Sequence, residues 1–324
     1  MSLRSSLTKI FLGLGFCLAL ASHDVSGATE SSLTVTPIGS ALEIPATLIR
    51  PDGAGPFPAI VIMHDCSGLG PRSSGAPARW SKALVQQGYV VLIPDSFTPR
   101  GFPDGVCTIP GSETTSASGY ARAADAYGAL GALRALPFVD GKRVGVMGNS
   151  HGGWTVLAAM VAAQPGGDNA LAEAKRNGFA AALALYPSCT PRYGGWSTAR
   201  EKGSRFGPAV TFSGTYQPLA PLLILTGEKD DWTPAEPCRR LVEASRAAGY
   251  PVEIKVYPGA HHGFDNDRPV RYDARRNNPN SPSGRGATTG GDSAASADAG
   301  KQVASFFSLH LKQSAENPTG NAAR

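Results

Sequence analysis

The chain has 324 residues, of which 42% are hydrophobic and 17% are charged, and its formal net charge at pH 7 is +5. This length is enough for one large domain with a sizeable apolar core. This positive charge is mild, and no stripe of Lys and Arg with interleaved aromatic residues occurs in the sequence. The sequence therefore does not have the pattern of a nucleic-acid-binding surface.

The first 27 residues predict a signal peptide that is removed from the mature protein. Arg4 and Lys9 form a basic start, and the apolar run Ile10–Ala21 is too short for a comfortable membrane span. Ala19–Ala21 fits a cleavage site, and the small residues at 26–28 offer a second. We therefore expect an exported protein, periplasmic or secreted, with no stable membrane anchor after cleavage. An uncleaved anchor is the alternative.

The chain beyond this segment has four cysteines: Cys66, Cys107, Cys189 and Cys238. An even number in an exported chain predicts two disulfides, and unpaired buried cysteines are the alternative. No C-x-x-C pair occurs, so a zinc site of that kind is not expected.

Strands and helices alternate along the first half of the chain. Continuous apolar runs such as 59–63 are typical of strands that are buried on both faces. The expected elements are strands at 33–38, 42–50 and 59–63, a helix at 77–87, a strand at 89–93 and a helix at 117–136. The first two strands predict a hairpin near the edge of a sheet.

The same alternation continues in the second half. The expected elements are strands at 144–147, 179–186, 222–225 and 252–257 and helices after Ser150, at 234–248 and at 301–311. Residues 187–220 lack a clear period and predict a loop or small cap, residues 265–298 a flexible insertion, and residues 314–324 a disordered tail. The order predicts one α/β domain over 28–313 with a mostly parallel central sheet and helices on both faces.

The most informative motif is the G-x-S-x-G of Gly148–Gly152. A short apolar strand precedes it and a helical segment follows it, which together predict a nucleophile elbow. Glycines beside the serine allow the sharp, strained turn that exposes the Ser150 hydroxyl. A simple Gly/Ser turn is the alternative.

A serine hydroxyl needs a base to accept its proton and an acid to orient that base. In this architecture the acid and then the histidine follow the serine. Residues 226–234 follow one predicted strand and contain Asp230 and Asp231, whereas His261 and His262 follow the next strand. Adjacent side chains on extended backbone diverge, so a metal pair at the two histidines is not expected.

These pieces make the chain resemble the dienelactone hydrolase family of α/β-hydrolases over roughly residues 40–312. The matching motifs are the elbow, the G-x-x-D-x-x-x-P of Gly227–Pro234, the H-G-F of His262–Phe264, and the segments 62–68 and 94–97. The resemblance implies that Ser150 is the nucleophile, Asp230 the orienting acid and His262 the general base. Asp231 and His261 remain the alternatives.

The resemblance also implies the surroundings of the reacting carbonyl. The backbone N–H groups of His151 and Cys66 are the expected oxyanion donors. Arg100 is expected near a substrate carboxylate, with a solvated loop arginine as the alternative. The family's second arginine has no clean match, since Asn266 lies near its position and Arg268 a little beyond.

The order of strand ends in this fold suggests how the cysteines pair. Cys66 and Cys107 lie in loops at the carboxyl end of the sheet, and Cys189 and Cys238 follow two neighbouring strands. We therefore predict the disulfides Cys66–Cys107 and Cys189–Cys238, because each pair joins neighbouring loops.

The expected function is that of a serine hydrolase that cleaves a small carboxylic ester or lactone through an acyl-enzyme, without metal or cofactor. The name-giving dienelactone hydrolases use a cysteine and work in the cytoplasm, so the hydrolase chemistry carries over but the dienelactone substrate does not. An acyl-peptide hydrolase or an acyltransferase with the same triad is the alternative, and a non-catalytic binding protein is a third. The sequence does not indicate the oligomeric state.

Overall fold

A computed structural model describes residues 27–112, 115–162, 169–200 and 210–313. The predicted signal peptide, apart from residue 27, and the whole of the predicted tail lie outside these residues. None of the helices within the described ranges is long and apolar enough to span a membrane.

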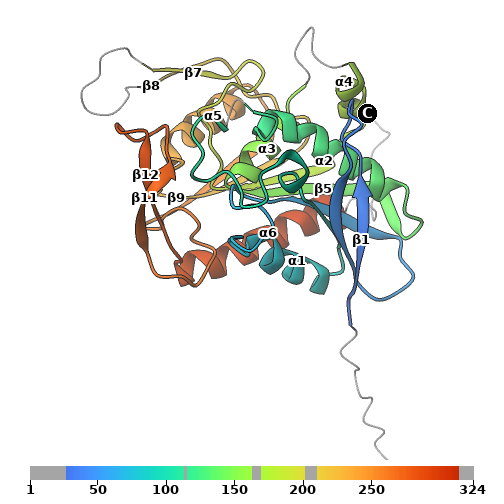
Figure 1. Cartoon of the computed structure of the whole chain (residues 1–324). Helices are drawn as coiled ribbons and strands as arrows, with labels where there is room; N and C mark the ends of the chain where they lie inside the picture. The colour runs from blue at the N-terminus through green and yellow to red at the C-terminus, as the bar shows by residue number, and fades with distance from the viewer. Residues whose placement is uncertain (1–26, 113–114, 163–168, 201–209, 314–324) are drawn as a thin grey trace, which may run out of the picture.

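An eight-stranded sheet in the order β1-β2-β4-β3-β5-β6-β9-β10 forms the centre of the fold (Figure 1). β2 runs antiparallel to its neighbours β1 and β4, and every other pair is parallel. The hairpin expected at the sheet edge is therefore present. The strands are β1 (Thr29–Val35), β2 (Ile44–Arg50), β3 (Phe57–Met63), β4 (Val90–Pro94), β5 (Val139–Asn149), β6 (Ala181–Leu185), β9 (Leu222–Gly227) and β10 (Val252–Tyr257).

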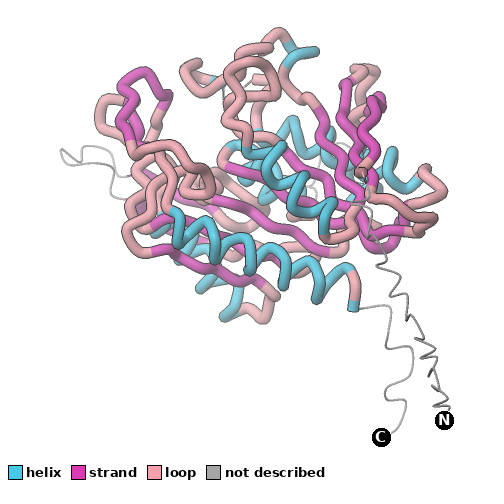
Figure 2. The backbone as a smooth tube through the Cα atoms, turned by 90° about the horizontal axis from the view of Figure 1, so that it is seen from below, coloured by secondary structure: helices cyan, strands magenta, loops and turns pink. Residues whose placement is uncertain are grey.

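Helices cover both faces of this sheet. α1 (Ala76–Gln86) and α6 (Ser293–Leu311) pack on one face, which Figure 2 shows from below. α2 (Gly119–Arg134), α3 (His151–Ala159) and α5 (Ala235–Ala247) pack on the other. β4, β6 and β9 are buried along their whole length, because apolar side chains on both of their faces meet a helix layer.

The polar segment 265–298 differs from the flexible insertion that the sequence predicts. β11 (Arg271–Asn277) and β12 (Arg285–Thr289) form an antiparallel hairpin, and α6 begins at Ser293 where the side chain of Asp292 accepts a hydrogen bond from the N–H of Ala295. The Asn278 side chain donates to the backbone oxygens of Asp231 and Gly286. Segment 265–298 is polar in composition because polar contacts to the loop around Asp231 hold this two-stranded ribbon in place. The ribbon has no apolar face that would give a strand period in the sequence.

Residues 187–220 contain a second small hairpin, formed by β7 (Ser197–Arg200) and β8 (Val210–Ser213). The Trp196 ring stacks on Phe212 at a centroid distance of 5.7 Å, and Tyr193 and Tyr216 are buried beneath it. These scattered aromatic residues follow no strand period, which explains why the sequence indicates only a loop or cap. A short helix, α4 (Asn169–Arg176), was not predicted.

Both predicted disulfide pairs are present in the structure. Cys66 bonds Cys107 and Cys189 bonds Cys238, with Cα separations of 4.9 and 5.1 Å. They close loops with sequence separations of 41 and 49 residues. In the chain-entropy model each bridge stabilises the fold by about 4 kcal/mol.

Two glycines give a matched test of the elbow's packing. A Cβ at Gly152 would overlap the carbonyl oxygen of Met63, whereas a Cβ at Gly131 in α2 meets nothing within 4 Å. Gly152→Ala should therefore lower the free energy of unfolding by the roughly 1–3 kcal/mol typical of overpacking, and with it Tm, because the backbone must move. Gly131→Ala should raise the free energy of unfolding by about 0.5–1 kcal/mol because alanine favours a helix. Thermal denaturation of both variants checks this, and equal Tm shifts would contradict the packing described.

Candidate active site

Ser150 stands in the turn between β5 and α3. Its backbone has φ 53° and ψ −112°, a strained conformation for a residue with a Cβ. The turn is so tight that a Cβ at Gly148 would overlap the backbone of Gly152, which explains why glycine is needed at position 148. The Ser150 N–H donates to the carbonyl of Leu185 at 2.9 Å, which ties the turn to β6. This geometry is that of the elbow expected from the motif.

His262 and Asp230 complete a hydrogen-bonded chain with Ser150. His262 Nε2 lies 2.8 Å from Ser150 Oγ, and His262 Nδ1 lies 2.8 Å from Asp230 Oδ2. All three side chains are buried. Because Nδ1 donates to the carboxylate, Nε2 is left as the acceptor for the serine proton.

The loop after β9 holds the Asp230 carboxylate in one orientation. It accepts hydrogen bonds from the backbone N–H groups of Trp232 and Thr233 at 3.0 and 2.7 Å, and from the Thr233 hydroxyl at 2.9 Å. These donors satisfy the carboxylate at a buried position and fix the oxygen that faces His262.

The neighbours Asp231 and His261 have other contacts. The Asp231 carboxylate accepts from the N–H and hydroxyl of Thr288 at 2.8 and 2.7 Å, so it anchors β12. His261 Nδ1 lies 3.1 Å from the carbonyl of Lys229 at an exposed position. Neither contacts Ser150, and the geometry therefore favours Asp230 and His262.

The expected oxyanion donors border the same cavity as Ser150. Cys66 follows β3 and His151 opens α3, and both residues line one cavity together with Ser150. No hydrogen bond joins the backbone N–H of either residue to another described residue. The Cys66 carbonyl accepts from the Val106 N–H at 2.7 Å, and the bridge to Cys107 holds the same loop.

Arg122 on α2, which was not predicted as a site residue from the sequence, links these two segments. Its guanidinium donates to His151 Nδ1 and to the carbonyl of His64, both at 2.8 Å. The side chain is fully buried, and burial lowers its pKa despite the nearby carboxylate of Asp125. Burial and the Arg122 charge hold the pKa of His151 well below its usual range, so the imidazole is neutral and accepts this bond.

Removing Arg122 should displace both expected oxyanion donors. Arg122→Met leaves the His64 carbonyl and His151 Nδ1 without their donor, and we expect kcat to fall roughly a hundredfold. Arg134→Met is the matched control on the same helix, since the hydrogen bonds of Arg134 within the described part of the chain go to the carbonyls of Gly141, Asn177 and Gly178, away from Ser150. The control should change Tm more than kcat. The test measures kcat by steady-state kinetics and Tm by thermal denaturation for both variants. Equal losses of kcat in the two variants would refute the role of Arg122.

Arg100 is not where the resemblance placed it. Its guanidinium makes two hydrogen bonds to the Asp125 carboxylate at 2.9 and 2.7 Å and a third to the Ser96 carbonyl at 2.6 Å. Its side chain is 9% exposed and lines neither cavity at Ser150. The expectation of a substrate-binding Arg100 is therefore corrected. The buried Asp125 needs a charged partner, and Arg100 supplies it.

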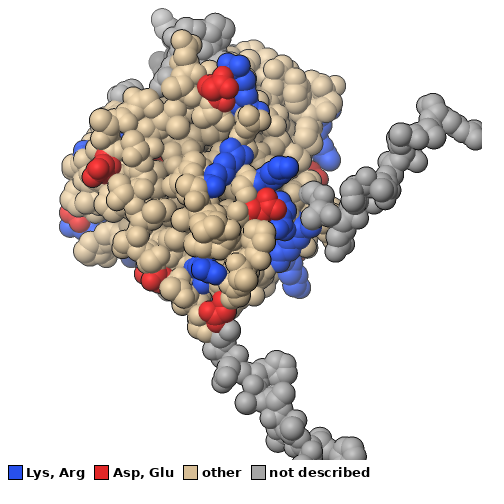
Figure 3. Space-filling model, turned by 90° about the vertical axis from the view of Figure 1, so that its right-hand side faces the viewer, with Lys and Arg blue, Asp and Glu red and all other residues tan. Residues whose placement is uncertain are grey.

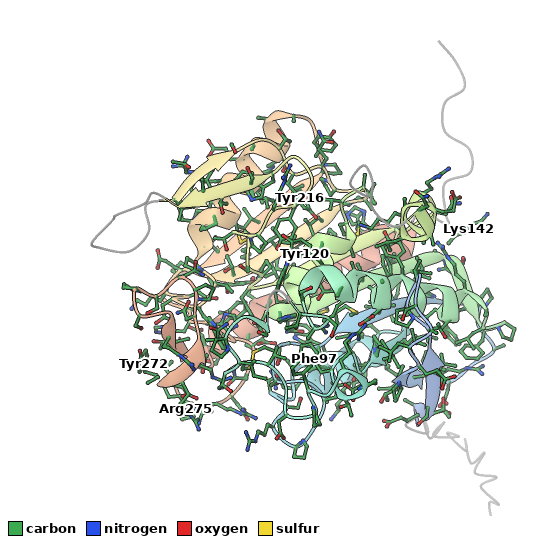
Figure 4. All side chains as sticks on the ribbon, turned by 45° about the horizontal axis from the view of Figure 1, so that its top comes forward. Phe97, Tyr120, Lys142, Tyr216, Tyr272 and Arg275 are labelled. Atoms are coloured by element: carbon green, nitrogen blue, oxygen red, sulfur yellow. A yellow bond between two sulfur atoms is a disulfide. The ribbon has the colours of Figure 1, made fainter. Side chains whose placement is uncertain are left out.

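Ser150 lies where two cavities meet. The smaller, of about 90 Å³, also contains His262 and Tyr186. The larger is an open cleft of about 580 Å³, with Tyr120 (labelled in Figure 4) in its wall. Arginines exceed carboxylates around the smaller cavity, where Arg72, Arg79, Arg268, Arg271 and Arg276 face Asp65 and Asp265.

Both carboxylates of the smaller cavity are already engaged. Asp265 accepts from the Tyr186 hydroxyl and from Trp80 Nε1, each at 2.7 Å, and Asp65 accepts from the hydroxyls of Ser67 and Ser74. The lining holds five arginines against these two carboxylates, although Arg79 pairs with Asp265 at 3.6 Å and Arg72 and Arg276 pair with Asp104 and Asp273. Elsewhere, on the face shown in Figure 3, basic and acidic side chains are interspersed and most of the surface is uncharged.

No set of three or more His, Cys, Asp or Glu side chains among the described residues is arranged to hold a metal ion. The groups that lie at Ser150 are the hydroxyl, the imidazole, the carboxylate and the backbone N–H groups described above. They can move a proton and stabilise an oxyanion.

Sheet order, the turn at Ser150 and the positions of Asp230 and His262 after β9 and β10 define the class: this is an α/β-hydrolase fold, as the sequence predicts. The model of the "Dienelactone hydrolase family" matches residues 44–311, and the chain belongs to that family. It is thus a dienelactone hydrolase-like hydrolase.

Similar proteins agree with this assignment. The chain is 27% identical to the "Putative carboxymethylenebutenolidase" of Yersinia pestis, covering 72% of this chain and 78% of that protein. A dienelactone hydrolase-like promiscuous phosphotriesterase from metagenomic libraries has the same fold with a TM-score of 0.58 at 19% identity, covering 88% of this chain and 99% of that one. Thermogutta terrifontis esterase 2 gives 0.54 at 16% identity, covering 87% and 95%.

Proposed function

We propose that this chain is a serine hydrolase that cleaves a carboxylic ester or lactone through an acyl-enzyme. The observation that supports this most is the buried chain Asp230–His262–Ser150, with 2.8 Å at each link. A serine hydroxyl in this setting loses its proton to the imidazole as it attacks.

The reaction has two halves in this geometry. Ser150 Oγ attacks the carbonyl carbon, His262 Nε2 takes the hydroxyl proton, and the N–H groups of Cys66 and His151 stabilise the oxyanion. The carbon–oxygen bond to the alcohol breaks, and His262 returns the proton to the leaving oxygen. Water, deprotonated by His262, then attacks the acyl-enzyme and releases the acid and Ser150. Asp230 keeps the imidazole oriented and stabilises its charged form.

The arginines of the smaller cavity take the role that Arg100 does not have. Arg276 on β11 is half-buried, stands 5.1 Å from the Trp232 ring centroid and pairs with Asp273 at 3.4 Å. Arg268 and Arg79 line the same cavity. Guanidinium groups bind carboxylates in a fork geometry, so we propose that this cavity accepts a substrate with an anionic group.

A substrate panel tests the proposed reaction. Purified protein is offered p-nitrophenyl esters of increasing acyl length beside peptide p-nitroanilides. Ester hydrolysis with an initial burst of p-nitrophenol is the expected result, because the acyl-enzyme accumulates. Faster cleavage of the anilides than of every ester would favour a peptidase, and transfer of the acyl group to an added alcohol in preference to water would favour an acyltransferase.

We also propose that the chain is exported and that a signal peptide of about 27 residues is removed. The support is the basic start and apolar run at the N-terminus together with two disulfides in the fold, which persist in an oxidising compartment. N-terminal sequencing of the mature protein should begin between Ser22 and Thr29. Recovery of Met1 on membrane-integrated protein would reject the proposal.

A further inference from the structure

The larger cleft beside Ser150 indicates what kind of acid the substrate contains. We propose that it is the acyl subsite and that it selects a bulky, uncharged aromatic acyl group. This inference rests on the proposed ester hydrolysis. Three observations support it: His262 lines the smaller cavity and not the cleft, the side chains around the cleft are uncharged, and hydrogen bonds hold two of its aromatic side chains in place.

The position of His262 distinguishes the two sides of the substrate. The imidazole must reach the leaving oxygen to protonate it, so the alcohol lies on the side of His262. His262 lines the smaller cavity of about 90 Å³ and is not among the residues of the cleft. His151, one of the expected oxyanion donors, lines only the cleft. The acyl substituent therefore extends into the cleft and the alcohol into the arginine-lined cavity.

The cleft has the size and chemistry of a site for an apolar group. Its volume of about 580 Å³ lies within the roughly 300–1,000 Å³ of small-molecule sites. The described residues that line it include no Asp, Glu, Lys or Arg. Three large aromatic side chains, Tyr120, Trp154 and Trp232, lie in its wall, and Tyr120 meets Trp154 edge to face at a centroid distance of 5.4 Å. Aromatic walls of this kind favour a planar ring over a flexible chain.

Hydrogen bonds fix the polar ends of two of these walls. The Tyr120 hydroxyl donates to the carbonyl of Arg192 at 2.8 Å, and Trp232 Nε1 donates to the carbonyl of Asn277 at 2.7 Å. Their ring carbons are thus held in place for contact with a ligand. The disulfides Cys66–Cys107 and Cys189–Cys238 restrain segments that border the cleft. A preorganised wall costs a ligand less ordering entropy on binding.

The experiment compares acyl groups on one leaving group. The p-nitrophenyl esters of acetate, nonanoate and 3-phenylpropanoate are hydrolysed by the wild-type protein, Tyr120→Ala and Tyr120→Phe. Tyr120 suits this test because its side chain is substantially exposed and its loss removes little core. Tyr272→Ala is the matched control, an exposed tyrosine on β11 that lines neither cavity; Figure 4 shows Tyr272 at the margin of the molecule and Tyr120 near the centre of the view.

We expect kcat/KM for the phenylpropanoate to exceed that for the nonanoate by about tenfold, although both acids have nine carbons. Tyr120→Ala should reduce this ratio by about tenfold, whereas Tyr120→Phe and Tyr272→Ala should retain it. A ratio at or below one in the wild type, or an equal ratio in Tyr120→Ala, would overturn the aromatic subsite while leaving ester hydrolysis intact. Failure to hydrolyse any of the three esters would instead reject the proposed function.

Discussion

Ser150→Ala should reduce ester turnover by about a thousandfold or more. Only a hydroxyl is lost, and its single contact among the groups of the site is His262 Nε2 at 2.8 Å. The strained turn is set by the backbone, since the Ser150 N–H bonds Leu185 and its carbonyl bonds the Trp154 N–H, both at 2.9 Å. The variant should therefore fold normally, with an unchanged Tm. The measurement is kcat for a p-nitrophenyl ester, corrected for background hydrolysis.

A matched serine makes this result interpretable. Ser245 is fully buried in α5 and donates to backbone carbonyls of Tyr216 and Leu241, away from both cavities. Ser245→Ala should lower Tm but keep kcat. Wild-type turnover in Ser150→Ala would refute the serine mechanism outright.

Asp230→Asn should reduce kcat by a factor on the order of 10³–10⁴, as expected when the partner of a catalytic imidazole no longer fixes its tautomer. An amide at this position places an N–H group where Nδ1 of His262 requires an acceptor. The backbone N–H groups of Trp232 and Thr233, which donate to Oδ1 of the carboxylate, would hold the amide oxygen at that position. The amide nitrogen would then face His262. The measurement is kcat with the same ester.

Asp231→Asn is the control for that loss, because it has the same chemistry one residue later. Among the described residues of the hairpin, the Asp231 carboxylate accepts hydrogen bonds from the N–H and hydroxyl of Thr288, so β12 should loosen in this variant while His262 stays oriented. Kinetics that rank Asp231→Asn below Asp230→Asn in activity would show that the acid is Asp231.

The parts of the fold that follow from periodicity were predictable. The apolar runs at β3, β4 and β9 indicate strands buried on both faces, and alternation with helices predicts a parallel sheet. The motif at Ser150 and the strand ends before Asp230 and His262 also predict that the three side chains meet. Parallel strands bring their carboxyl ends to one edge of the sheet, and no long-range information is needed for that step.

Other features depend on partners that are distant in sequence. The polar β11–β12 hairpin has no apolar period, and its order comes from contacts with the loop around Asp231. Arg100 and Arg122 look alike in the sequence, yet one pairs with Asp125 and the other reaches His151 and His64. The partners of each arginine depend on how α2 packs on the sheet. No local sequence pattern predicts that packing.

The most direct test of the serine mechanism is covalent labelling with a fluorophosphonate probe, followed by peptide mapping. We expect one labelled residue, Ser150, because among the described residues its hydroxyl is paired with the imidazole that Asp230 orients. We also expect His262→Ala to be labelled far more slowly, whereas His261→Ala should be labelled at the wild-type rate. Label on a different residue, or active protein that hydrolyses esters without taking up the probe, would contradict it.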